Sequence, residues 1–219
     1  MAAKKSREES MDDKIVSAFM TYALEHEKTP VSVYKFCKEI AVSEDAFYKS
    51  YGSLDAVKKD IWNRFFQNTL SLLEKNKDYA GFSNKEKMLT FFFTMFELLT
   101  LNRSYVLFVL KEHDNLPKNM TQLKGLRKRV KEYAADLIDQ GNATKAYKIS
   151  KHNPTVFSEG AWLQFLFLLK FWADDDSAGF ERTDMAIEKS VNTIFDIFDN
   201  TPLDSLFDFG KFLYKEHLT

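Results

Sequence analysis

The feature that most constrains this chain is the helical spacing of its apolar residues, together with the scarcity of residues that end helices. Within residues 12–27, one buried helix face is spelled out at i, i+3, i+4, i+7 and i+8 by Ile15, Ala18, Phe19, Tyr22 and Ala23. The 219 residues include only 7 glycines and 4 prolines. No segment keeps the period of two that a half-buried strand requires. The sequence therefore predicts an all-α protein.

Breaks and capping residues divide this helical chain into two parts. Thr29-Pro30 ends the first helix, and Ser32, Ser43 and Ser53 can cap the three helices that follow. We expect a helix-turn-helix head with three helices in residues 1–53 and a larger helical body in residues 54–219. The body is predicted to end in a dimerisation helix pair, and Gly141 is predicted to end the helix that begins near residue 117.

Composition excludes several classes of protein. Apolar residues make up 45% of the chain and charged residues 29%, which excludes wholesale disorder. Cys37 is the only cysteine, so the fold contains no internal disulfide. The longest apolar run, residues 161–173, is too short to span a bilayer, and the start of the chain lacks an apolar signal core. We expect a soluble, cytoplasmic protein with no membrane partner.

No pattern of an enzyme is present in the sequence. There is no glycine-rich phosphate loop and no nucleophile elbow, and the four histidines are scattered without metal-ligand spacing. Residues 174–176 are three consecutive aspartates, for which a solvated loop is a better interpretation than a cation site. The sequence predicts a protein that is not an enzyme and that needs no cofactor or metal.

The most informative segment is residues 31–62, in which two short capped helices meet at Ile40-Ala41-Val42-Ser43. Such a turn leaves the second helix roughly perpendicular to the first, in position to enter a major groove. The segment resembles the helix-turn-helix of the TetR family of transcriptional regulators. The matching positions are the cap Ser32, the apolar pair Phe36-Cys37, the turn residues Val42-Ser43, the helix end Phe47-Tyr48, the aromatic Tyr51, the cap Ser53 and the apolar Val57.

The resemblance implies a homodimer whose two heads read a pseudo-palindromic operator in double-stranded DNA, acting as a repressor controlled by a ligand bound in the body. Carried over by position, Glu44, Asp45 and Ala46 would face base edges. Phosphate contacts would come from Ser32, Tyr48, Lys49 and Ser53. The implied DNA-binding set is completed by Lys38, Ser43 and Lys58.

The head departs from the family pattern at two positions, and its recognition helix is acidic. Ala41 replaces the turn glycine, which is tolerable if that residue stays outside positive φ. Leu54 replaces a phosphate-binding lysine, and the acidic pair Glu44-Asp45 lies on the recognition helix. Residues 1–62 hold 10 basic and 11 acidic groups, which argues against strong non-specific DNA binding. A helix-turn-helix kept only for packing is therefore an open alternative.

The body is rich in aromatic residues. The chain contains 21 phenylalanines, and an aromatic interior can line a pocket for an apolar small-molecule effector or simply fill a core. The predicted effector-binding residues are Phe92, Phe96, Leu99, Arg103, Phe108, Tyr133 and Phe165. The predicted dimerisation residues are Trp162, Phe165, Leu166, Leu169, Ile187, Val191 and Ile194.

A second resemblance keeps another function open. Residues 171–184 are weakly similar to a tract in the TetR-fold lipid-binding proteins of ubiquinone biosynthesis. The matching positions are Trp172, Asp176, Ser177 and Thr183. This similarity implies an alternative in which the same fold carries a lipid or metabolite and does not bind DNA.

Overall fold

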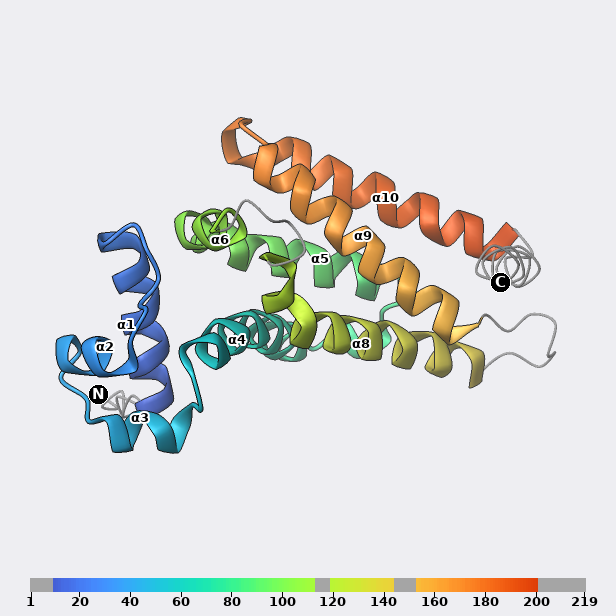
Figure 1. The fold of residues 1–219 in the computed structure, drawn as a ribbon. Coiled ribbons are helices and arrows are strands. Elements are labelled where there is room, and N and C mark those ends of the chain that lie inside the picture. The colour runs from blue at the N-terminus through green and yellow to red at the C-terminus, as the bar shows by residue number, and fades with distance from the viewer. Residues whose placement is uncertain (1–9, 113–118, 144–152, 201–219) are drawn as a thin grey trace, which may run out of the picture. The chain divides into compact units, whose positions relative to one another are not determined.

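The computed structural model describes residues 10–112, 119–143 and 153–200, and every regular element in these ranges is a helix. The prediction of an all-α protein is confirmed (Figure 1). The α-helices are α1 (Met11–Glu25), α2 (Val33–Glu39), α3 (Glu44–Ser50), α4 (Leu54–Lys75), α5 (Asn84–Leu101), α6 (Arg103–Leu110), α8 (Lys124–Ala143), α9 (Pro154–Asp174) and α10 (Glu181–Asn200).

Local sequence fixes where several helices begin. A capping box starts α1, because the Ser10 hydroxyl accepts the amide of Asp13 at 3.1 Å and the Asp13 carboxylate accepts the amide of Ser10 at 3.3 Å. Ser83 and Glu86 form the same reciprocal pair at the start of α5. Asn153 caps α9 ahead of a proline in its first turn. Each of these helix starts is defined by residues that lie within three positions of one another in the sequence.

Gly141 does not end α8, contrary to the prediction, because the helix continues to Ala143. The glycine instead makes room for a neighbour. A Cβ atom at position 141 would collide with the side-chain amide of Asn84, which begins α5. A glycine inside a helix can therefore mark a close approach and not a helix end.

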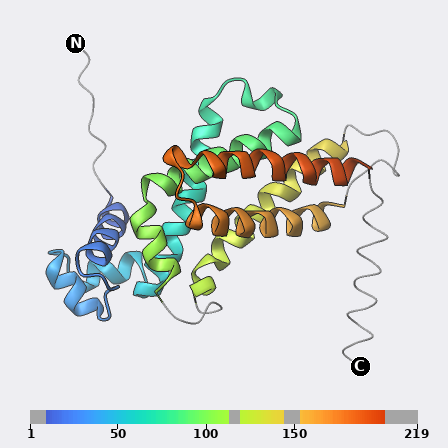
Figure 2. The same ribbon diagram turned by 90° about the horizontal axis from the view of Figure 1, so that it is seen from above.

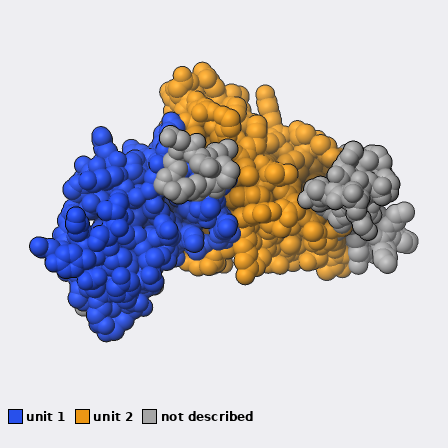
Figure 3. Space-filling model, viewed as in Figure 1, with its two compact units in different colours: residues 1–65, 99–126 blue, residues 66–98, 127–219 orange. Residues whose placement is uncertain are grey.

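The chain packs as two compact units (Figure 3). The first unit is residues 1–65 and 99–126, and the second is residues 66–98 and 127–219. The first unit contains the helix-turn-helix, the first three turns of α4, and α6. The packing unit thus includes more than the predicted head, and the functional boundary at residue 53 remains a prediction.

Aromatic side chains form the core of the second unit. Phe96 lies 5.9 Å from Phe165 between ring centroids, and Trp162 stacks on Phe165 at 5.4 Å. Helices α9 and α10 run side by side in opposite directions (Figures 1 and 2), with Phe157 and Phe195 in edge-to-face contact at 5.3 Å. Such contacts stabilise a core beyond the area that they bury.

Within the described ranges, no single helix has the length and apolar character needed to cross a membrane. Helices α5 and α6 meet that test only when they are counted together, and they are bent by 90° at their junction.

Candidate nucleic-acid interface

Two serines start the helices of the helix-turn-helix, as predicted. The Ser32 hydroxyl accepts the amide of Lys35 at 3.4 Å, and the Ser43 hydroxyl accepts the amide of Ala46 at 3.1 Å. Because each hydroxyl satisfies a backbone amide that the helix leaves without a partner, the caps define where α2 and α3 begin. Ser53 caps α4 in the same way, through the amide of Ala56 at 3.1 Å.

The turn between α2 and α3 does not meet the condition under which alanine is easily tolerated. Ala41 has a φ of +52°, in the left-handed region. The Val42 amide donates to the Cys37 carbonyl at 3.0 Å, which is the 6→1 bond of a Schellman motif. This motif needs a left-handed residue at the position after the cap. Alanine therefore occupies a strained position that glycine would fill without strain.

One side of α3 is anchored in a small aromatic core. Phe47 is fully buried and meets Phe36 edge-to-face at 6.4 Å, and Phe36 meets Phe19 of α1 in the same way at 5.9 Å. The Tyr51 ring at the end of α3 is also buried and lies 6.2 Å from Phe47. These contacts fix which face of α3 points inward.

The opposite face of α3 is open to solvent. Glu44, Asp45, Tyr48 and Lys49 are exposed, with 53% of Tyr48 accessible, and Ala46 is half-buried. Lys49 forms an ion pair with Asp45 at 2.6 Å, one turn apart on the helix. The side chains of α3 that we predicted to contact bases or phosphates therefore lie on the solvent side of the helix. The charge of Asp45 is balanced by Lys49.

A polar cluster ties the end of α3 to α4 and α1. The Tyr51 hydroxyl donates to Asp60 at 2.7 Å, and Arg64 Nε donates to the same carboxylate at 2.7 Å. Arg64 also pairs with Asp13 of α1. Burial, followed by the hydrogen bond to Asp60, raises the pKa of Tyr51, so its hydroxyl stays protonated and remains a donor. The exit from the recognition helix is thereby fixed.

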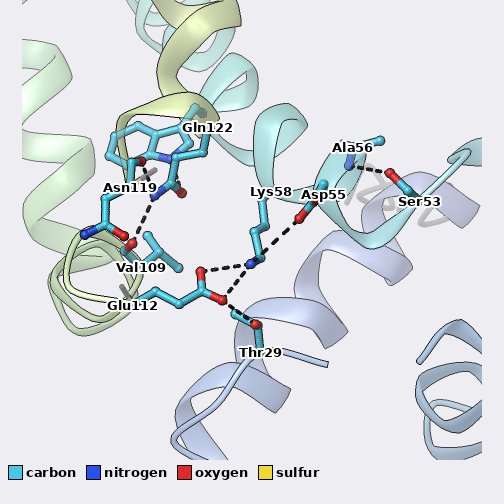
Figure 4. A network of polar contacts seen from close by, with 10 residues as sticks. Thr29, Ser53, Asp55, Ala56, Lys58, Val109, Glu112, Asn119 and Gln122 are labelled. Atoms are coloured by element: carbon cyan, nitrogen blue, oxygen red, sulfur yellow. Dashed lines mark hydrogen bonds and ion pairs between the residues drawn. The ribbon is translucent and has the colours of Figure 1, made fainter. Parts of the chain in front are cut away.

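The remaining residues of the predicted DNA-binding set lie in different surroundings. Lys38 is exposed near the end of α2. Lys58 is different, because its side chain is only 12% exposed and its ammonium lies 2.7 Å from Glu112 (Figure 4). Because this ammonium is half-buried and already paired with a carboxylate, we remove Lys58 from the proposed phosphate contacts.

The predicted effector residues are divided between the two units. Leu99, Arg103 and Phe108 belong to the first unit; Phe92, Phe96, Tyr133 and Phe165 belong to the second. Of these seven, four are buried, namely Phe92, Phe96, Leu99 and Phe165, and the other three are half-buried.

Tyr133 already has partners of its own. It stacks on Phe91 at 4.7 Å, and its hydroxyl lies 2.5 Å from the Tyr79 hydroxyl. Burial raises the pKa of Tyr133, and the contact with Tyr79 raises it further. A role in effector binding remains a prediction for all seven residues.

The predicted dimerisation residues lie mostly inside the single chain. Five of them are buried: Trp162, Phe165, Leu169, Ile187 and Val191. Leu166 and Ile194 are half-buried. The exposed apolar side chains on the same helix α9 are Leu163, Phe167 and Phe171, at positions one to two turns apart, and Phe167 and Phe171 lie 6.1 Å apart. We define these three as the α9 stripe; sequence spacing alone did not separate it from the core face.

One structural carboxylate was missed. We expected Asp176 to match the lipid-binding proteins, but Asp176 is exposed and pairs with Arg182. The buried Asp175 instead accepts the amide and hydroxyl of Ser177 at 2.9 and 2.7 Å, and those of Thr183 at 2.9 and 2.7 Å. Burial opposes ionisation, yet these four bonds outweigh it and hold the pKa of Asp175 below its usual range. Asp175 therefore organises the turn before α10.

Potential metal ligands do not gather in the described part of the chain, where no group of three or more His, Cys, Asp or Glu residues could hold an ion.

Comparison with known proteins identifies the family. A model of the "Tetracyclin repressor-like, C-terminal domain" family matches residues 87–213, more than half of the chain. No curated protein matches. Among solved structures, a transcriptional regulator of the TerR/AcrR family from Aquifex aeolicus VF5 is similar over 84% of this chain and 99% of that chain, with 14% identity and a TM-score of 0.47. The family match confirms the resemblance inferred from residues 31–62: this chain belongs to the tetracyclin repressor-like family.

Proposed function

We propose that this protein is a transcriptional regulator that binds a specific DNA sequence through α3. The observation that carries the proposal is the orientation of that helix. Phe47 is buried, whereas Glu44, Asp45, Tyr48 and Lys49 are exposed on the opposite side. A short capped helix that is anchored to the core by Phe47 and presents polar side chains to solvent is suited to insertion into a major groove.

Charge supports sequence selection over general DNA affinity. The head is nearly neutral, and the Lys49 ammonium is shared with Asp45. Neutralised phosphates supply most non-specific affinity, so a head whose basic groups are matched in number by acidic ones should bind random DNA weakly. Glu44 and Asp45 can accept from the amino group of cytosine, and they disfavour bases that present only acceptors. We expect a weak salt dependence and a marked base preference under α3.

A homodimer is the second part of the proposal. The α9 stripe exposes three large apolar side chains, Leu163, Phe167 and Phe171, and Met185 of α10 is 50% exposed as well. A self-complementary contact between two copies of this helix pair would cover such side chains. Two heads related by a twofold axis would then read a pseudo-palindrome. Repression, which rests on the family resemblance, and control by an apolar effector, which rests on the aromatic interior of the body, complete the proposal.

Selection of bound duplexes from a random pool tests the proposal directly. The wild-type protein should enrich a short palindromic motif. Tyr48→Ala should weaken binding to all sequences, because a phosphate contact carries no sequence information. Asp45→Asn should change the enriched bases, and it should raise the affinity for random DNA because it frees Lys49. Phe93→Ala, an exposed aromatic in the second unit, is the control and should match the wild type.

Two results would contradict this reading. One is a pool in which the folded wild-type protein enriches no motif. The other is a pair of variants, Tyr48→Ala and Asp45→Asn, that affect every operator equally. Native mass spectrometry of the purified protein then tests the carrier alternative, which requires a co-purifying apolar molecule.

A further inference from the structure

One carboxylate joins the two ends of the helix-turn-helix. Glu112 lies just after α6, and its Oε1 accepts a hydrogen bond from the Thr29 hydroxyl at 2.5 Å (Figure 4). Lys58 Nζ donates to both carboxylate oxygens, at 2.7 and 2.8 Å. Thr29 precedes α2 and Lys58 follows α3. Glu112 therefore closes the chain segment that contains the whole helix-turn-helix, and we call these three residues the Glu112 clamp.

The clamp is shielded from water. The side chains of Lys58 and Glu112 are 12% and 14% exposed, whereas the Lys49–Asp45 pair on α3 is more than 70% exposed on both sides. Screening by solvent makes the exposed pair weak, whereas a half-buried pair is screened less. Lys58 also lies 3.9 Å from Asp55, so removal of Glu112 would leave the ammonium with this longer contact. Of the two pairs, the clamp therefore contributes more to the position of the helices that it joins.

A second link holds the same end of α6 to the same face of α4. The Trp62 indole donates to Gln122 at 2.9 Å, and the Gln122 amide donates to the carbonyl of Val109 at 3.0 Å. Lys58 and Trp62 are four residues apart on α4, so they lie one turn above each other. The end of α6 is thus fixed to α4 at two levels, and all of these residues belong to the first compact unit.

The clamp connects to α3 through contacts already described. Thr29 leads into α2, whose Phe36 packs on Phe47 of α3. On the other side, α3 ends at Tyr51, which is bonded to Asp60 of α4, two residues beyond Lys58. The recognition helix therefore lies between the two groups that Glu112 binds, so a change at either group alters its support.

We propose that Glu112 is a positioning residue for DNA binding: the clamp sets the orientation of α3, so operator affinity depends on this carboxylate. The proposal rests on the proposed function and assigns to Lys58 an indirect role in place of a phosphate contact.

The test compares three variants on the operator selected by the wild type. Thr29→Val removes one hydrogen bond and is the mildest change, while Lys58→Met and Glu112→Gln break the ion pair. Each should lower operator affinity by between about twofold and thirtyfold, the usual range for residues that couple two sites. The slope of log affinity against log salt should not change, because no phosphate contact is lost. Lys59→Met, an exposed neighbour on α4, is the control.

The salt slope separates positioning from direct contact. A lysine that touches a phosphate contributes about 0.9 to the slope, and because the proposed homodimer carries two copies, its removal should lower the slope by about 1.8. Any loss in Lys59→Met should follow that rule, and a slope change of that size in Lys58→Met would overturn the proposal. A second selection with Lys58→Met should enrich half-sites at a changed spacing. General loss of folded protein would lower the active fraction but leave the spacing as it was.

Hydrogen exchange gives a measurement that needs no DNA. In Thr29→Val, amides of α3 and of the last turn of α6 should exchange faster, while those of α10 should not change. Unchanged exchange in α3 would refute the clamp even if the protein bound no operator. Faster exchange in α3 together with no enriched motif for the wild type would refute the proposed function and keep the structural link.

Discussion

Replacing Ala41 by glycine should stabilise the protein, against the usual effect of adding a glycine. The residue has a φ of +52°, and this conformation costs an L-amino acid about 1–2 kcal/mol. Glycine avoids that cost but adds about 0.4–1 kcal/mol of conformational entropy to the unfolded chain. The Ala41 methyl is exposed, so its loss removes no packing. The difference predicts that the free energy of unfolding rises by about 0.8 kcal/mol.

Urea unfolding followed by far-UV circular dichroism measures this change, and a thermal scan should show Tm higher by about 2–3 °C. Ala18→Gly is the matched control, since Ala18 lies inside α1 with ordinary helical geometry. The control should lose about 0.5–1 kcal/mol. If Ala41→Gly lowered the urea midpoint as Ala18→Gly does, the positive φ of Ala41 would not be destabilising the turn.

Three further predictions follow from the burial and hydrogen bonding of single residues. The Tyr105 hydroxyl is buried without a hydrogen-bond partner among the described residues, so Tyr105→Phe should raise the free energy of unfolding by about 1 kcal/mol, measured as a higher urea midpoint. Asp175 has a lowered pKa in the folded state, so its contribution to the free energy of unfolding is complete above the unfolded pKa of about 4 and is lost as the pH falls below it. Asp175→Asn should therefore make the free energy of unfolding, measured by urea unfolding at several pH values, depend less on pH in the acid range. Phe167→Glu should convert dimer to monomer in sedimentation velocity, whereas Leu24→Glu, on an equally open site of α1, should not.

Local chemistry explains why the helices and their starts could be predicted from sequence. Apolar spacing and serine caps act over three or four residues, so each is complete within the segment that it organises. Ser32, Ser43 and Ser53 all cap as expected. The outward side of α3 also follows from spacing, because burying Phe47 places Tyr48 and Lys49 on the other side.

Contacts between distant positions explain what the sequence did not disclose. Lys58 and Thr29 reach Glu112 across 54 and 83 residues, and no short-range pattern records such a meeting. A lysine on an amphipathic helix is usually solvated, so the sequence favoured a DNA contact. Asp175 was missed for a related reason: three consecutive aspartates are equivalent in sequence, and only their folded surroundings separate the buried one.

The low net charge of the head and the contacts that fix its recognition helix have a common physical explanation. A basic head can find DNA through phosphates and tolerate some movement, because electrostatic attraction acts at a distance and has little dependence on orientation. The head of this protein is nearly neutral, and its exposed Lys49 is paired. Under the proposed function, the affinity of the head for DNA would come from short hydrogen bonds, which weaken steeply with distance and angle. Fixing both ends of the helix-turn-helix with Glu112, and its exit with Arg64, would supply the accuracy that such contacts need.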